Sequence, residues 1–181
     1  MSKTSAAAAK ALTSNYFELF GLAPAFALDL QALESAYRDI QSRIHPDRFA
    51  HAGDAERRAS MQMTTQVNEA YRALGNPVLR AKHILELNGI DLAFETDTSM
   101  PEDFLTRQME FREQLEEAKD TAALDAMLEE LNAERKKIEE QIKTSIDQDK
   151  DFQSAKIFVR KLMFFDRLEG EVDEIYGALE T

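Results

Sequence analysis

The sequence predicts an all-α protein with an N-terminal helical hairpin and a C-terminal three-helix bundle. The chain of 181 residues holds only six glycines and four prolines, which is few for a loop-rich fold. Good helix formers such as Ala, Leu, Glu and Met dominate the composition. Apolar residues also recur at intervals of three and four along most of the chain, which is the spacing of one helix face.

The N-terminal region predicts a tail, a short helix and a long helix. Residues 1–14 lack both the apolar core of a secretory signal and the arginines of a transit peptide, and we expect them to be disordered. Asn15 predicts the N-cap of a short helix that ends at Gly21, and Asp29 predicts the N-cap of the long one. The long helix should end near His45, which precedes a proline. Its predicted apolar face is Leu30, Leu33, Tyr37, Ile40 and Ile44.

A second long helix is predicted from about Asp54 to Gly75. Its apolar face is predicted to be Met63, Val67, Ala70, Tyr71 and Leu74. Pro77 is well placed to start a closing helix, which Gly89 ends. The two long helices are joined by about ten residues, so we expect them to pack antiparallel and to hold the intervening loop out at one end.

The C-terminal region predicts a linker and three helices. Residues 91–100 show no clear periodicity and are interpreted as the linker, and residues 101–181 as an antiparallel bundle with short connections. Pro101 opens the first helix, and Asp120 with Thr121 marks the turn before the second. The apolar stripe of the second helix is predicted to be Leu124, Leu128, Leu131, Ile138, Ile142 and Ile146. That of the third helix is predicted to be Phe158, Leu162, Phe165, Leu168 and Val172.

Charge and composition exclude several functions. The net charge is −12, and residues 91–181 hold twelve Lys/Arg against twenty-five Asp/Glu, a net charge of −13. An acidic half repels phosphate, so we expect no nucleic-acid binding and favour a partner with a basic surface. The absence of cysteine excludes disulfides, thiolate nucleophiles and zinc fingers. No apolar run approaches the roughly 20 residues that span a membrane, and we expect a cytoplasmic protein.

The loop between the two long helices reads RIHPDRFAHAG, from Arg43 to Gly53. As a tripeptide, His45-Pro46-Asp47 is weak evidence, because an ordinary proline stop would look the same. Its position at one end of a helical hairpin is more informative. There the tripeptide faces a partner instead of the core.

The segments NYFELFGL, AYRDIQSRIHPDRF and VNEAYRALGNPVLRA together resemble a J-domain over residues 15 to about 90. The resemblance implies stimulation of the ATPase of a DnaK-class chaperone, with no catalytic role for the J-domain itself. The chaperone-binding residues that it implies are His45, Pro46 and Asp47, with Arg38, Arg43 and Arg48 as the basic residues nearby. The second helix of a J-domain is usually more basic, and here Arg38 and Arg43 lie roughly 140° apart around it.

The acidic block that begins PEDFLTRQMEFREQLEEA, taken together with the J-domain, resembles the HscB family of iron–sulfur cluster assembly co-chaperones. The resemblance runs over nearly the whole chain. It implies binding of an IscU-type scaffold through the C-terminal bundle and its delivery to HscA, a specialised DnaK-class chaperone. It implies no cofactor, and we expect a monomer. Eukaryotic members add an N-terminal cysteine-rich segment, so we expect a bacterial type.

The helix that Pro101 opens carries two apolar groups. Phe104, Phe111 and Leu115 cluster within about 40° and form the core stripe. Leu105 and Met109 lie about 100° and 140° from Phe104, so either another element covers them or they bind a partner. The resemblance implies scaffold binding by Leu105, Met109, Glu110, Glu113 and Phe164. The competing interpretation is that Leu105 and Met109 pack against helix 121–149 or the J-domain.

The remaining candidates suggest no chemistry. We interpret His51 and His83 as structural or exposed histidines and expect no metal site. His83 stands where the J-domain family often has an aromatic residue, so we expect it to be partly buried. No nucleophile, oxyanion donor or phosphate-cradling glycine loop is recognisable, and we therefore expect no enzymatic activity.

Two other functions stay open at this point. In the first, a J-domain protein carries a bundle that binds a different client or serves as a rigid spacer. In the second, the chain is a helical structural or regulatory protein in which His-Pro-Asp occurs by accident. Substitution of His45 or Asp47 separates the second from the J-domain hypothesis.

Overall fold

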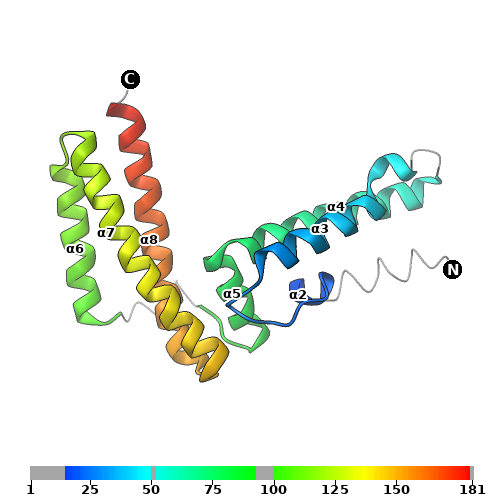
Figure 1. Cartoon of the computed structure of the whole chain (residues 1–181), viewed down its shortest axis with the longest axis horizontal. Helices are drawn as coiled ribbons and strands as arrows, with labels where there is room; N and C mark the ends of the chain where they lie inside the picture. The colour runs from blue at the N-terminus through cyan, green and yellow to red at the C-terminus, as the bar shows by residue number, and fades with distance from the viewer. Residues whose placement is uncertain (1–14, 50–51, 93–99, 180–181) are drawn as a thin grey trace. The chain divides into compact units, whose positions relative to one another are not determined.

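The computed structural model describes residues 15–49, 52–92 and 100–179, and these residues form helices with no strand among them (Figure 1). They belong to two compact units, Met1–Leu87 and Asn88–Thr181. The all-α prediction is therefore confirmed. The predicted tail, the histidine at position 51 and positions 93–99 of the predicted linker lie outside the described residues. Within the described ranges, no helix has the length and apolar character that crossing a membrane requires.

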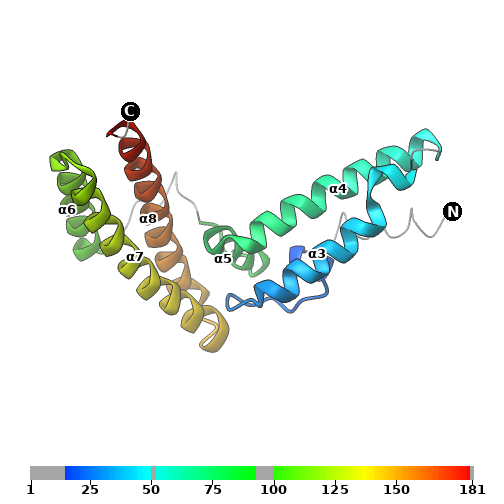
Figure 2. The same ribbon diagram turned by 45° about the horizontal axis from the view of Figure 1, so that its top comes forward.

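The first unit is built around a helical hairpin. Its described elements are α2 (Tyr16–Leu19), α3 (Leu30–Ile44), the 3₁₀ helix η1 (Pro46–Phe49), α4 (Asp54–Gly75) and α5 (Pro77–Leu87). Helices α3 and α4 run side by side in both ribbon views (Figures 1 and 2). The ring of Tyr37 stacks on that of Tyr71 at 4.1 Å, and the Tyr37 hydroxyl donates to Asn68 Oδ1 at 3.0 Å. The predicted hairpin is confirmed.

Side-chain caps fix where the first two helices begin. The Asn15 carboxamide oxygen accepts a hydrogen bond from the Glu18 N–H at 2.9 Å. The Asp29 carboxylate accepts from the N–H groups of Gln31 and Ala32 at 2.9 and 3.1 Å. Each cap satisfies helix donors that would otherwise lack a partner, which is worth roughly 1 kcal/mol. Both predicted N-caps are confirmed.

The core of the first unit lies between the hairpin, α2 and α5. Its buried apolar residues are Phe17, Phe20, Phe26, Leu33, Ile44, Val67, Ala70, Ala73, Leu74, Val78, Ala81, Ile84 and Leu85. Leu30, which we expected on the buried face of α3, is exposed. It is the first residue of its helix, whereas Leu33 in the same turn is buried.

Among the described residues of this unit, one charged side chain is buried. Arg80 Nη1 on α5 donates to the Leu74 carbonyl at 2.6 Å, and its guanidinium lies 5.1 Å from the centre of the Phe26 ring. The Leu74 carbonyl belongs to the last turn of α4, where carbonyl groups have no helical partner. Arg80 therefore ties the end of α4 to α5, a role that the apolar pattern did not predict.

The second unit is a bundle of three long helices, as predicted. Its elements are α6 (Glu102–Glu117), α7 (Thr121–Lys143), the π-helical turn η2 (Thr144–Gln148) and α8 (Phe152–Leu179). The three α-helices lie side by side in both ribbon views (Figures 1 and 2). Asp120 caps α7, because its carboxylate accepts from the Ala123 N–H at 2.9 Å.

Aromatic rings form the centre of this bundle. The Phe165 ring of α8 meets Phe104 and Phe111 of α6 edge-to-face, at centroid distances of 5.8 and 5.5 Å. Two positions of the predicted stripes, Leu128 and Phe158, are only half-buried, whereas their neighbours Met127 and Val159 are buried. Adjacent apolar residues fit a spacing of three or four equally well, so the pattern alone did not choose between them.

The turn between α7 and α8 contains a feature that the apolar pattern did not predict. The Asp149 N–H donates to the Thr144 carbonyl five residues earlier, at 3.0 Å, which closes the π-helical turn. Lys150 then adopts φ +56°, a conformation that L-residues other than Asn and Asp seldom use. Asp151 accepts hydrogen bonds from the Ser154 hydroxyl at 2.6 Å and the Ser154 N–H at 3.0 Å. These bonds favour the charged carboxylate and lower the pKa of Asp151.

Ion pairs join each pair of helices in the bundle. The pairs are Arg107 with Glu130 between α6 and α7, Arg112 with Glu171 between α6 and α8, and Arg135 with Glu169 between α7 and α8. Burial alone would lower the pKa of Arg107, but hydrogen bonds to Glu110 and Glu130 outweigh it and raise the pKa. Pairs near the surface contribute little free energy individually. They add polar contacts from α6 to both of its neighbours.

Candidate functional site

The first candidate site is the connection between α3 and α4. Helix α3 ends at Ile44, because His45 precedes Pro46 and adopts an extended conformation with φ −53° and ψ 130°. The chain then forms η1, so a short 3₁₀ helix occupies part of the segment that we predicted to be a loop. The connection lies at one end of the hairpin, as Figure 2 shows.

His45 and Asp47 lie close together and point into solvent. The Asp47 N–H donates to His45 Nδ1 at 3.3 Å, and the Asp47 carboxylate lies 3.5 Å from the same nitrogen. The Asp47 side chain is 89% exposed. Arg48 anchors the connection, because its N–H donates to the His45 carbonyl and its guanidinium to the Ser42 carbonyl, each at 3.0 Å. The backbone is thus held by local bonds while the two side chains are available to a partner.

A buried serine that the motif analysis missed fixes the start of this connection. The Ser60 hydroxyl on α4 donates to the Ile44 carbonyl at 2.7 Å, and both residues are buried. Ser60 lies seven residues before Val67 and so continues the apolar stripe of α4. The position of Ser60 in that stripe could have indicated a buried hydrogen bond from the sequence, since a small polar residue on an apolar stripe needs a partner.

We expect Ser60→Ala to destabilise the first unit by about 1–3 kcal/mol, because the buried Ile44 carbonyl loses its partner. Urea unfolding followed by circular dichroism measures the effect. Thr65→Ala is the matched control, since it removes an exposed hydroxyl that bonds only within α4, to the Met61 carbonyl. Equal losses in the two variants would refute the role assigned to Ser60.

The basic residues of α3 do not join the His45–Asp47 cluster. Arg38 forms an ion pair with Glu34, and Arg43 forms one with Asp39 at 2.5 Å, each within the helix. Arg38, Asp39 and Arg43 are exposed, and Glu34 is half-buried. The two arginines therefore keep the separation that the helical wheel predicts, and their charges are partly offset by neighbouring carboxylates.

The second candidate site is on the surface of α6. Leu105 is 44% exposed and Met109 is 65% exposed, although α6 packs against both other helices of the bundle. The core of the second unit uses Phe104, Phe111 and Leu115 of this helix instead. Packing within the bundle therefore does not explain why Leu105 and Met109 are apolar.

Phe164 on α8 extends this surface. Its half-buried ring meets Phe104 edge-to-face at a centroid distance of 5.7 Å, and it meets Phe165 at 5.4 Å. Phe104 precedes Leu105 in the chain, so the structure brings the α8 residue to the helix that carries the other two. We refer to Leu105, Met109 and Phe164 as the apolar patch.

Two carboxylates lie beside the apolar patch. Glu110 and Glu113 are exposed, and around α6 they lie about 100° and 40° from Met109. Glu110 accepts from Arg107 at 2.7 Å, whereas Glu113 forms no ion pair with any residue in the described ranges. The sequence analysis did not predict the ion pair between Arg107 and Glu110, although their i, i+3 spacing on one helix would have indicated it. An exposed apolar patch with an acidic border fits a partner that is apolar and basic.

His83 is half-buried, as predicted. Its ring stacks on Tyr16 at 4.2 Å, and its Nε2 accepts the Tyr16 N–H at 3.1 Å. Burial lowers the pKa of His83, and the nearby Glu86 carboxylate opposes this only in part. His83 therefore acts as a neutral acceptor that holds α2 against α5.

Stability should consequently decrease in mild acid. The unfolded chain, with a histidine pKa of about 6.5, binds a proton at His83 before the folded chain does. The contribution of His83 is complete above about pH 6.5 and is lost as the pH falls below that value. Thermal unfolding midpoints of the wild type and His83→Phe between about pH 5.5 and 7.5 measure this effect. The variant should show the weaker pH dependence; parallel curves would contradict the assignment.

Comparison with known proteins extends over both units. The family model described as "HSCB C-terminal oligomerisation domain" matches residues 100–173. A "Co-chaperone protein HscB homolog" of Burkholderia multivorans is 46% identical over 173 residues, which cover 94% of this chain and 98% of that protein. The corresponding protein of Aromatoleum aromaticum is 42% identical over the same shares.

Solved structures agree with this similarity. The human co-chaperone protein HscB is 31% identical with a TM-score of 0.85, over 90% of this chain and 82% of that one. Chaperone HscB from Vibrio cholerae is 36% identical with a TM-score of 0.79, over 92% of this chain and 99% of that one.

Proposed function

The chain belongs to the HscB family of co-chaperones, and from this membership we propose that it couples a folded client to a DnaK-class chaperone. The family acts in iron–sulfur cluster assembly. The client is then an IscU-type scaffold, and the chaperone is of the HscA type. The observation that carries the proposal is the presence on one chain of two exposed sites, the His45–Asp47 cluster and the apolar patch, in separate compact units.

We assign the chaperone-binding role to residues 15–90. His45 and Asp47 supply polar side chains on a backbone that local hydrogen bonds hold, so little conformational entropy is lost on binding. Pro46 fixes the backbone between them. Arg48 in the connection and Arg38 and Arg43 along α3 supply positive charge, which would favour a chaperone surface with negative potential. Glu34 and Asp39 partly offset the charges of the two α3 arginines.

We assign the client-binding role to residues 101–181. Leu105, Met109 and Phe164 provide the apolar contact, and methionine adapts its shape readily to a partner. Glu110 and Glu113 supply carboxylates at the edge of that contact. Apolar anchors bordered by charges are typical of protein interfaces, in which a few residues carry most of the binding energy.

In this role the chain performs no chemistry of its own. Its relatives are named co-chaperones. In the proposed role, ATP hydrolysis takes place on the chaperone. The chain contributes by binding both partners at once, which raises the local concentration of the client at the chaperone. We propose that it does so as a monomer in the bacterial cytoplasm.

The test is the rate of ATP hydrolysis by an HscA-type chaperone. The rate is measured in single turnovers with this chain, with an IscU-type scaffold, and with both together. We expect stimulation by the chain alone and a greater-than-additive rate with both. Unchanged hydrolysis in every mixture would leave a helical protein of another role, whereas stimulation without any effect of the scaffold would leave a co-chaperone for a different client.

A further inference from the structure

Methionine carries all the sulfur of this chain, because the sequence contains seven methionines and no cysteine. A thioether is oxidised to a sulfoxide, and exposure to the oxidant largely decides which methionines react first. Two methionines of the described ranges are mostly exposed, Met61 at 61% and Met109 at 65%. Oxidation of the folded chain is therefore expected to begin at these two residues.

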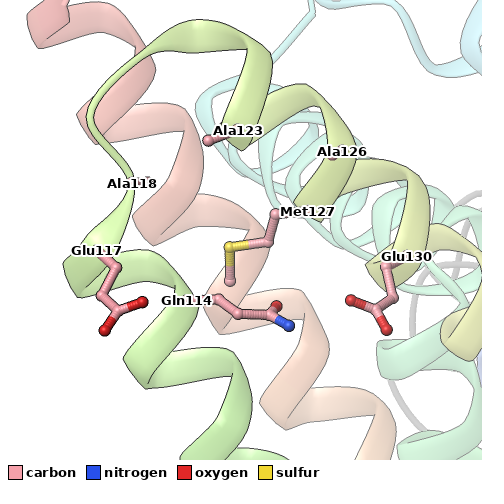
Figure 3. A pocket seen from close by; sticks show the side chains of 7 residues that line it. All are labelled: Gln114, Glu117, Ala118, Ala123, Ala126, Met127 and Glu130. Carbon is pink, nitrogen blue, oxygen red and sulfur yellow. The ribbon is translucent and has the colours of Figure 1, made fainter.

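Met127 shows how the bundle protects a methionine. Its side chain extends from α7 toward Gln114 of α6 (Figure 3). Only 4% of Met127 is exposed, although it borders a pocket of about 280 Å³. The other methionines that the structure describes are half-buried; they are Met63, Met100 and Met163. These four residues should react more slowly than Met61 and Met109.

Met61 and Met109 differ in their surroundings. Met61 lies on α4 of the first unit, and the residues one turn away from it on either side are all polar: Arg57, Arg58, Thr64 and Thr65. Met109 instead belongs to the apolar patch and lies one turn after Leu105. A polar group at Met61 joins an already polar surface, whereas a polar group at Met109 changes the character of the patch.

The reaction at Met109 is the transfer of one oxygen atom from hydrogen peroxide. The lone pair of the Met109 sulfur attacks a peroxide oxygen, the O–O bond breaks, and the second oxygen leaves as water. The sulfur loses two electrons and the peroxide gains two, so no further reactant is needed. The product side chain carries a polar oxygen on the sulfur in place of an apolar thioether.

The neighbours of Met109 on α6 do not satisfy such an oxygen. The sulfoxide oxygen is a hydrogen-bond acceptor and therefore needs a donor when a partner covers it. Arg112, three residues later, is paired with Glu171, and Glu113, four residues later, is itself an acceptor. An acceptor that leaves water without a donor is costly to bury. Oxidation of Met109 therefore opposes the burial of the apolar patch against a partner.

We propose that Met109 is a site of reversible oxidation by peroxide and that its sulfoxide form releases the client. The proposal rests on the proposed function, because it takes the client to be the protein that covers the apolar patch. It adds to that function a dependence on the oxidant. Reversal requires a methionine sulfoxide reductase, which removes the oxygen as water while a dithiol supplies the two electrons.

The test treats the full chain with hydrogen peroxide. Peptide mass spectrometry measures the sulfoxide at each methionine over time, and calorimetry measures the Kd for an IscU-type scaffold. We expect the Kd to rise about ten-fold once Met109 is oxidised. Treatment with methionine sulfoxide reductases and dithiothreitol should restore the starting Kd. Circular dichroism should show unchanged helix content, because Met109 lies outside the core of the bundle.

Matched leucine variants separate the two exposed methionines. Leucine is close to methionine in volume and helix propensity, but it does not react with peroxide. The measured quantity is the ratio of the Kd after peroxide to the Kd before, so the starting affinity of each variant does not matter. We expect a ratio of about ten for the wild type and Met61→Leu, and about one for Met109→Leu.

Three results would overturn the proposal. The first is oxidation of Met109 no faster than that of the buried Met127. The second is a wild-type ratio near one when Met109 is fully oxidised, in which case the proposed function stands without this regulation. The third is a ratio in Met109→Leu as large as that of the wild type, which would assign the effect to another methionine. If the untreated wild type does not bind the scaffold, the proposed function fails and this proposal fails with it.

Discussion

Leu105→Ala/Met109→Ala is expected to bind an IscU-type scaffold about 100-fold more weakly than the wild type. Both side chains are exposed in the bundle, so their burial against a partner would supply apolar contact that the free protein does not have. Truncating two interface anchors costs about 3 kcal/mol together, which corresponds to that factor in the Kd. Isothermal titration calorimetry measures it directly.

The same exposure makes the loss specific to binding. Exposed side chains contribute little to folding, and the unfolding free energy of the variant should stay within about 0.5 kcal/mol of the wild type. Met61→Ala is the matched control, because Met61 is 61% exposed but lies on α4 of the other unit. A wild-type Kd for the double variant would remove the client-binding assignment.

Adding Phe164→Ala should abolish measurable binding, but this substitution has a cost in stability as well. The Phe164 ring packs against Phe104 and Phe165, and the removal of an aromatic pair costs roughly 0.5–1.5 kcal/mol beyond the lost area. Circular dichroism must therefore accompany the titration. The bundle should stay helical, since Phe104, Phe111 and Phe165 still form its centre.

His45→Ala and Asp47→Asn should each reduce stimulation of an HscA-type ATPase to near the basal rate. Asp47 offers a charged acceptor, and a hydrogen bond to a charged group contributes about 1.5–3 kcal/mol. Loss of that amount weakens binding to the chaperone by about ten- to hundred-fold. Single-turnover hydrolysis at a fixed, sub-saturating concentration of the chain measures the effect.

Two controls distinguish a loss of chaperone binding from a loss of folding. Neither side chain supports the core, so both variants should unfold at the wild-type midpoint and bind the scaffold with the wild-type Kd. Asp125→Asn makes the same chemical change at an exposed site on α7 and should stimulate normally. Full stimulation by both His45→Ala and Asp47→Asn would rule out this mode of chaperone binding.

The sequence predicted those features that depend on local chemistry. Asn15 and Asp29 precede helices and cap them, as predicted. Asp120, which was predicted only to mark a turn, caps α7 as well. The proline after His45 ended α3 where expected. The partial burial of His83 was expected from the resemblance to a J-domain, where an aromatic residue often stands at that position, and the structure supplies the stacking partner, Tyr16.

Features that depend on tertiary contacts were missed. No local pattern indicates that Arg80 reaches the Leu74 carbonyl or that Ser60 reaches the Ile44 carbonyl, since each bond joins separate segments. The exposure of Leu30 has the same origin, because the periodicity shows which face is apolar and not how far a neighbour extends along it. The π-helical turn was hidden because Ile142 and Ile146 continue the apolar stripe through it.

The hydrogen bond from the Asp47 N–H to His45 Nδ1 decides which form of the imidazole a partner encounters. A nitrogen that accepts a hydrogen bond carries no proton, so the neutral ring must hold its proton on Nε2. The exposed edge of His45 is then a donor. A protein that recognises it needs an acceptor at the matching position, such as a backbone carbonyl or a carboxylate, and a lysine or arginine placed there would be rejected.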